Sequence, residues 1–266
     1  MSRILILLAA LLLAPGLRAQ FDLGKMTKAL DKAKALAGDA GKVAKGVAGI
    51  GPKEEAVIGD SVALEIISRH GGLDRDEAAT WRVNVIGRAL ASFSARPERE
   101  WRFAVLASAH INAFSAPDGY VFITRALYDL CEDDDRLAAV LAHEIAHITG
   151  RHALRIVERG EFLGVVGAQV VQRSTDAREL EAQLQQFDLG VAKIVETLLE
   201  KGFDPQTEYT ADQEGHRLAV LCGYAPTGLR AVLTALQARG ENRGTMFSTH
   251  PPIKERLKRL PAAKAP

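Results

Sequence analysis

The sequence predicts a mainly helical α+β fold with a small antiparallel sheet or hairpin, and three observations support this. Apolar residues recur at helical spacing in four segments, 54–69, 74–93, 206–221 and 226–239. Two shorter segments, 101–108 and 111–124, are rich in aromatic and β-branched residues, which favour strands. The stretch "LAAVLAHEIAHITGRH", residues 137–152, combines an apolar stripe with two histidines four residues apart. A chain of 266 residues can bury one substantial core around these elements.

The first 19 residues have the layout of a secretory signal peptide. Arg3 precedes an apolar run, residues 4–14, and the small residue Ala19 follows shortly after it. The run is shorter than the roughly 20 residues that a membrane-spanning helix needs. We therefore expect cleavage after residue 19 and a periplasmic or secreted protein. Loss of Arg3 and Arg18 leaves 32 basic and 33 acidic residues, a balance that does not indicate nucleic acid as a partner.

Residues 20–53 are rich in Ala, Gly and Lys and are expected to form a flexible segment before the folded domain. Apolar residues between Leu23 and Leu36 keep a helical spacing, so a short helix is expected there. Such a helix is compatible with peripheral contact with the outer membrane or its proteins, but we favour a mobile stalk outside the core. The folded domain is expected over residues 54–260, with a short tail at 261–266.

The elements of this domain follow from local patterns. In the helix over 74–93 we place Trp81, Val85, Ile86 and Leu90 on the inner face. The strands within 111–124 are joined by Pro117-Asp118-Gly119, a composition typical of a tight turn.

Acidic residues 132–135 mark the start of the next helix, because negative charge is favoured at a helix N-terminus, and this helix is expected to continue to residue 152. The rest of the chain is expected to be helical, over a long stretch within 154–200, over 206–221 and 226–239, and after Pro252. Asp204 and Pro205 are a typical N-cap and first-turn pair. Residues 161–173 are apolar but too short to span a membrane, so we interpret them as a core helix or a lid over the cleft, with contact with a membrane surface as the alternative.

The helix over 137–152 carries the pattern His143-Glu144-x-x-His147. Histidines four residues apart project about 40° from each other, so both can bind one zinc ion, and Glu144 can reach the water in an open zinc position. Zinc lowers the pKa of that water to about 7, and a carboxylate can take the proton as the water attacks a carbonyl group. The alternative is an ordinary buried helix, in which three ionisable residues would need other partners. We expect one zinc ion per chain, with Glu144 as general base.

Glu208 is the predicted third ligand. His152 follows Gly150 one position too early for the pattern in which a third histidine binds zinc, and position 153 is alanine. If the helix continues, His152 points away, so we interpret it as a helix-end residue. Glu208 lies on the next strongly patterned helix, and Asp212, one turn later, can accept a hydrogen bond from a ligand histidine. The alternative for Glu208 is a solvated acid at a helix start.

These motifs resemble the HtpX-like and CAAX-prenyl-protease-like zinc metalloprotease family, in particular its soluble periplasmic BepA-like branch. The stretches that carry the resemblance are "NAFSAPDGYVFITRAL", "LAAVLAHEIAHITGRH", "EYTAD" and "STHPPIKERLKRL". It implies a zincin-like metalloprotease domain in which His143, His147 and Glu208 bind zinc. It also implies that His250 lies near the metal, with Arg256 behind it, where a donor could stabilise an oxyanion.

We therefore expect a zinc-dependent metalloendopeptidase that hydrolyses exported, misfolded or misassembled envelope proteins. The alternative is a zinc-containing chaperone or binding module with little proteolysis, but a structural zinc would not need Glu144 beside an open position. The substrate is expected to bind as an extended strand along the hairpin 111–124. A second role considered for His250 is to occupy the open zinc position in the resting enzyme.

The family resemblance also implies that the two ligand helices cross antiparallel, which would bring Cys131 and Cys222 to the same end of the pair. An oxidising compartment would then allow a disulfide between them. The alternative is two reduced cysteines that act as small apolar residues.

Overall fold

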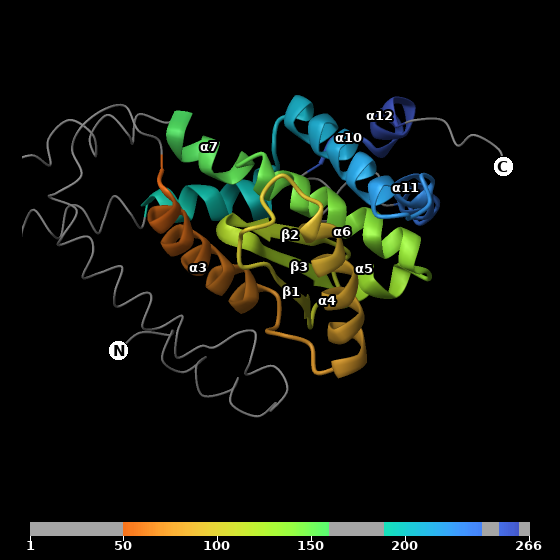
Figure 1. The fold of residues 1–266 in the computed structure, drawn as a ribbon, viewed down its shortest axis with the longest axis horizontal. Coiled ribbons are helices and arrows are strands. Elements are labelled where there is room, and N and C mark those ends of the chain that lie inside the picture. Colours follow the sequence, from red (N-terminus) through yellow and green to blue (C-terminus); the bar gives the residue numbers. More distant parts are fainter. Residues whose placement is uncertain (1–49, 160–188, 241–249, 261–266) are drawn as a thin grey trace, which may run out of the picture.

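The structure is a computed structural model in which residues 50–159, 189–240 and 250–260 are described (Figure 1). The described residues form helices around a three-stranded sheet, so the mainly helical α+β prediction is confirmed. The predicted signal peptide, the short helix expected near the N-terminus, residues 161–173 and the tail at 261–266 lie outside the described residues.

The sheet contains β1 (Arg102–Leu106), β2 (Ala113–Ala116) and β3 (Tyr120–Thr124) in the order β1-β3-β2. Strands β2 and β3 form the predicted antiparallel hairpin, whereas β1 pairs parallel to β3, so the sheet is mixed. The turn η4 (Pro117–Gly119) reverses the chain with Asp118 at φ 63° and Gly119 at φ 98°. A Cβ atom at Gly119 would lie 2.7 Å from the backbone oxygen of Glu100, so only glycine fits there.

Helices cover both faces of the sheet. Their bounds are α3 (Pro52–Arg69), α4 (Glu77–Ser92), α5 (Arg125–Leu130), α6 (Asp134–Thr149), α7 (His152–Arg159), a π-helical turn η5 (Thr197–Lys201), α10 (Pro205–Leu221), α11 (Gly228–Ala238) and α12 (Ile253–Arg259). Alternate residues of β1 and β3, such as Phe103 and Ile123, pack with α4, α6, α10 and α11. Their neighbours, such as Leu106 and Phe122, pack with α3, α7 and residues 194–198 on the other face. This alternation explains why both strands are wholly or almost wholly buried.

The inner face predicted for α4 is half correct. Ile86 and Leu90 are buried, but Trp81 is 69% exposed and Val85 is 47% exposed. The buried face also includes Ala79 and Val83, and at 100° per residue Trp81 lies about 140° around the helix from Ile86. Position on the helix, and not side-chain size, therefore decides which residues of α4 enter the core.

Helices α6 and α10 lie side by side and antiparallel, in green and blue in Figure 1. Ala225, just after α10, donates its N–H to Asp135 at the start of α6, whereas Gly215 in the middle of α10 lies against His143. A Cβ atom at position 215 would lie 2.8 Å from the backbone of His143, so this glycine allows the close approach. In the part of the chain that the structure covers, no helix combines the length and apolar character needed to cross a membrane.

Candidate functional site

Helix α6 presents His143, Glu144 and His147 toward one buried site. The side chain of Asp133 caps the helix by accepting from the N–H of Arg136, and two acidic residues follow in the first turn. All three site residues are buried. The Nε2 atoms of the two histidines lie 3.1 Å apart, so the two imidazoles converge on the same point.

Glu208 reaches this point from α10. The side chain of Asp204 caps α10 and Pro205 occupies its first turn, as predicted, which fixes Glu208 one turn into the helix. Its two carboxylate oxygens each lie 3.6 Å from the Nε2 atom of one histidine, His143 or His147. The candidate ligand atoms of the three residues lie within 4.8 Å of one another.

The chemistry of these three residues fits a divalent metal. Glu208 is fully buried, and its Oε1 atom has no hydrogen-bond partner among the described residues. Burial acts to raise the pKa of Glu208, but the neighbouring histidines outweigh burial and lower it well below its usual range. A buried, ionised carboxylate that faces two imidazole nitrogens is a typical donor set for zinc.

Asp212 and Arg256 support His143 from behind. An oxygen of Asp212 lies 3.0 Å from Nδ1 of His143, and Arg256 donates two hydrogen bonds to the same carboxylate, at 2.9 and 2.6 Å. Burial acts to raise the pKa of Asp212, but the charge of Arg256 and the bond to His143 lower it well below its usual range. Burial acts to lower the pKa of His143, but hydrogen bonds to Asp212 and Glu208 raise it to about 9.

Glu144 lies on the same side of α6 as a small cavity lined by His143, Asn112 and His250. Burial raises the pKa of Glu144, against the opposing effects of the two histidines and a hydrogen bond from Ser115. A carboxylate with a raised pKa accepts a proton more readily, which is the property that a general base needs.

His250 lies directly at the ligands, as the family resemblance implied. Its Nδ1 atom forms a short hydrogen bond with Glu208, and its ring centroid lies 5.7 Å from that of His143. Pro251 follows it, and helix α12 begins shortly afterwards and carries Arg256.

His152 also lies at the site, which the sequence did not predict. The helix was expected to continue to residue 152, but α6 ends at Thr149 and Arg151 adopts φ 54°. This break turns His152 back, so that its Nδ1 atom lies 2.9 Å from Nδ1 of His147. Burial lowers the pKa of His152 to about 4, so it is neutral at pH 7 and can accept a hydrogen bond from the Nδ1–H of His147. Gly150, the C-cap residue of α6, keeps a right-handed conformation, and the left-handed turn falls on Arg151.

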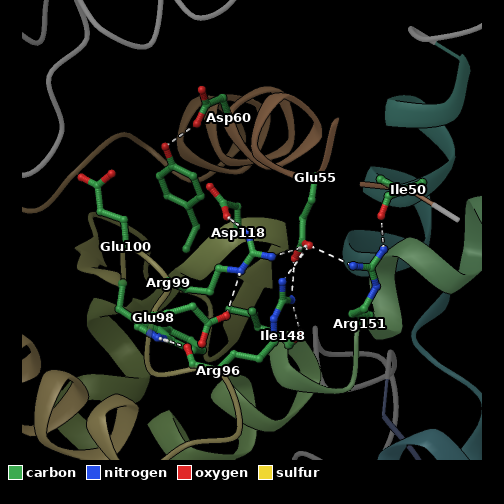
Figure 2. A network of polar contacts seen from close by, with 12 residues as sticks. Ile50, Glu55, Asp60, Arg96, Glu98, Arg99, Glu100, Asp118, Ile148 and Arg151 are labelled. Carbon is green, nitrogen blue, oxygen red and sulfur yellow. Dashed lines mark hydrogen bonds and ion pairs between the residues drawn. The ribbon is translucent and has the colours of Figure 1, made fainter. Parts of the chain in front are cut away.

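A buried charge network holds this break in place (Figure 2). The side chain of Glu55, in the first turn of α3, is 1% exposed and accepts two hydrogen bonds from Arg96, at 2.6 and 2.8 Å. Arg151 donates to the same carboxylate at 3.1 Å and to the backbone oxygen of Ile50 at 2.6 Å. Arg99 lies 3.4 Å from Glu55. The network therefore joins α3, the loop before β1 and the junction between α6 and α7.

The predicted disulfide is not present in the structure. Cys131 and Cys222 are both free, the first buried and the second half-buried. The two ligand helices do cross antiparallel, but Cys131 does not lie on α6: it is the C-cap residue of α5, and α6 starts only at Asp134. The alternative weighed above, two separate cysteines packed as small apolar residues, describes the structure. Burial raises the pKa of the Cys131 thiol to about 12, which makes it a poor nucleophile.

Comparison with known proteins adds a family match. The model of Peptidase family M48 matches residues 77–264. The chain is 27% identical over 201 residues to the mitochondrial metalloendopeptidase OMA1 of Schizosaccharomyces pombe, an alignment covering 74% of this chain and 57% of that protein. It is 27% identical over 199 residues to the beta-barrel assembly-enhancing protease of Escherichia coli, an alignment that covers 70% of this chain and 39% of that protein. It is 30% identical over 156 residues to a protease HtpX homolog of Bacillus subtilis, an alignment that covers 49% of this chain and 51% of that protein. The chain thus spans between 39% and 57% of the length of these relatives.

Proposed function

Because the chain belongs to Peptidase family M48, we propose that it is a zinc metalloendopeptidase whose active site is the point where α6 and α10 meet. The observation that carries the proposal is the convergence of His143, His147 and Glu208, with Glu144 beside them. In this proposal the first three residues hold one zinc ion. A zinc ion bound there would polarise a peptide carbonyl and make a water molecule more acidic.

Glu144 acts as the general base. Its carboxylate takes a proton from the attacking water and then passes it to the nitrogen that leaves when the peptide bond breaks. The raised pKa of Glu144 supports both transfers, since the protonated form is more accessible than for an exposed glutamate. Ser115, on β2, holds the carboxylate by a hydrogen bond.

The neighbouring residues position the ligands and the substrate. Asp212 accepts from Nδ1 of His143 and Arg256 holds Asp212, so the imidazole keeps its Nε2 atom toward the metal. His152 orients His147 in the same way, because its neutral imidazole accepts the hydrogen bond from Nδ1 of His147 that a carboxylate accepts in the case of His143. His250 is proposed to donate to the oxygen that becomes negatively charged as the carbonyl is attacked.

The substrate is proposed to bind as an extended strand beside β2. In the order β1-β3-β2, β2 pairs with β3 on one side, and among the described strands none pairs with its other edge. Strand β2 also packs against α6, which carries Glu144. Pairing through the backbone suits sequence-tolerant capture of unfolded chains.

We further propose that the protein is exported and acts on misfolded or misassembled envelope proteins in the periplasm. The N-terminal signal pattern and the similarity to the beta-barrel assembly-enhancing protease of Escherichia coli support this.

The test compares cleavage of an unfolded protein, such as reduced casein, by the wild type and by Glu144→Gln. The variant should retain one zinc ion per chain and lose nearly all activity, because its amide cannot take a proton. Glu214→Gln, an exposed change on α10, is the matched control and should cleave like the wild type. Equal cleavage by the wild type and Glu144→Gln would contradict the mechanism, and zinc without cleavage in the wild type would favour a binding module.

A further inference from the structure

The contact between His152 and the proposed ligand His147 depends on the turn that joins α6 to α7. The two Nδ1 atoms lie 2.9 Å apart, and Phe203 stacks on the ring of His147 at a centroid distance of 4.5 Å and meets the ring of His152 edge-on. Gly150 leaves the space for this contact, because a Cβ atom there would collide with Nε2 of His152. A small change in the turn would therefore separate the two imidazoles.

Arg151 makes this turn in a conformation that is unfavourable for a residue with a side chain. Its φ of 54° lies in the left-handed region that favours glycine. A residue other than glycine stays there only when its surroundings hold it. The guanidinium group of Arg151 donates to the carboxylate of Glu55 at 3.1 Å and to the backbone oxygen of Ile50 at 2.6 Å. These two bonds, to α3 and to the residues just before it, hold the turn.

The carboxylate of Glu55 also holds the last turn of α6. Arg96 donates two hydrogen bonds to Glu55 and one, at 3.4 Å, to the backbone oxygen of Ile148, the residue after His147 (Figure 2). A small cavity is lined by Glu55, Arg151 and His147 together, so the network borders the metal site directly. Through two arginines, Glu55 thus fixes the chain on the C-terminal side of His147.

We infer that Arg151 and Glu55 are positioning residues for the metal, which hold the turn that places His152 against His147 and thereby raise the affinity for zinc. The hydrogen-bond partner of Nδ1 fixes the orientation of an imidazole that binds a metal through Nε2, and loss of such a partner typically lowers metal affinity 10- to 100-fold. The inference rests on the proposed zinc peptidase and extends its site to α3. Glu55 lies before residue 77, where the match to Peptidase family M48 begins.

The first experiment measures the zinc affinity of the full chain by chelator competition. Arg151→Gly keeps the left-handed turn accessible, because glycine adopts it without strain, and removes only the bonds to Glu55 and Ile50. It should lose affinity several-fold, up to the roughly tenfold loss expected for His152→Ala, and Glu55→Gln, measured below its melting temperature, should lose a similar amount. Arg151→Lys, which can still reach one of the two acceptors, should bind zinc more tightly than Arg151→Ala. The control Glu54→Gln, an exposed change in the same turn of α3, should bind like the wild type.

The second experiment separates positioning from a general loosening of the fold. If Arg151 acts through His152, Arg151→Gly should cause no further loss of zinc affinity in a protein that already carries His152→Ala. Gly150→Ala approaches the same contact without the arginine. The backbone of Gly150 is right-handed and suits alanine, but the added methyl group would displace the ring of His152. This variant should lose zinc affinity without a fall in Tm, so it tests the inference even if Arg151→Gly does not fold.

The outcomes distinguish this inference from the proposed function. If the wild type binds no zinc at His143, His147 and Glu208, the proposed function fails and the inference fails with it. The function stands and the inference is overturned if a folded Arg151→Gly or Gly150→Ala binds zinc within about twofold of the wild type. The same holds if Arg151→Lys binds no better than Arg151→Ala, or if the effects of Arg151→Gly and His152→Ala on the free energy of zinc binding add.

Discussion

Replacing Glu55 by glutamine should destabilise the protein strongly although Glu55 lies on α3, outside the group of candidate metal ligands. Its carboxylate is buried and faces Arg96, Arg99 and Arg151, as Figure 2 shows. The amide of glutamine can still accept one hydrogen bond from Arg96, but it carries no charge. The carboxylates that remain near the three guanidinium groups would be Asp118, 2.8 Å from Arg99, and the exposed Glu98, 3.6 Å from Arg99.

Removing one partner of a buried ion pair typically costs about 3–5 kcal/mol of folding free energy. Because Glu55 serves several arginines and its side chain is 1% exposed, we expect a value of about 3 kcal/mol or more. For a protein of this size that corresponds to a fall in Tm of about 6 °C or more. The matched control is Glu54→Gln, an exposed residue in the same helical turn, which should change stability by less than about 0.5 kcal/mol.

Urea denaturation at several pH values measures this prediction. Burial acts to raise the pKa of Glu55, but the bond to Arg96 and the charges of Arg96, Arg99 and Arg151 lower it below its ordinary value of 4.5. The stabilisation is therefore complete above pH 4.5 and is lost as the pH falls through the lower, folded-state pKa. The difference between wild type and Glu55→Gln should shrink over that range. Equal unfolding midpoints for Glu55→Gln and Glu54→Gln at pH 7 would show that the charge of Glu55 does not stabilise the fold.

Three further predictions concern the residues around the ligands. His152→Ala should weaken zinc binding by about tenfold in a chelator competition, because His147 loses the group that orients it; unchanged affinity would assign His152 to the core alone. Asp212→Asn should weaken zinc binding by about 10- to 100-fold in the same assay, since Arg256 loses its charged partner, and Glu214→Gln should not. His250→Ala should lower kcat by about 100-fold, whereas a rise in basal cleavage would show that His250 blocks the site at rest.

Much of the fold could be predicted because its patterns are local. The hairpin of β2 and β3 follows from the strand-forming residues around Pro117-Asp118-Gly119, and α10 follows from its Asp204 cap and Pro205. The exposed side of α4 was misplaced because Trp81 was assigned by its apolar character, and only packing against β1 shows which face is buried.

The candidate metal ligands could also be predicted, because histidines four apart and an acid followed one turn later by a second acid are regular helical spacings. His152 could not be placed, since its position depends on the turn at Arg151, and that turn is held by Glu55, 96 residues away in the chain. The predicted bond between Cys131 and Cys222 had the same weakness: a helix break changes where a distant residue lies, and no local pattern reveals the result.

In the proposed enzyme, α6 and α10 together hold one zinc ion. Anomalous scattering at the zinc absorption edge, from crystals of the protein loaded with one equivalent of zinc, locates that ion. A single peak is expected within bonding distance, about 2.0–2.2 Å, of His143, His147 and Glu208. A peak elsewhere on the protein, or none among these three residues, would contradict it.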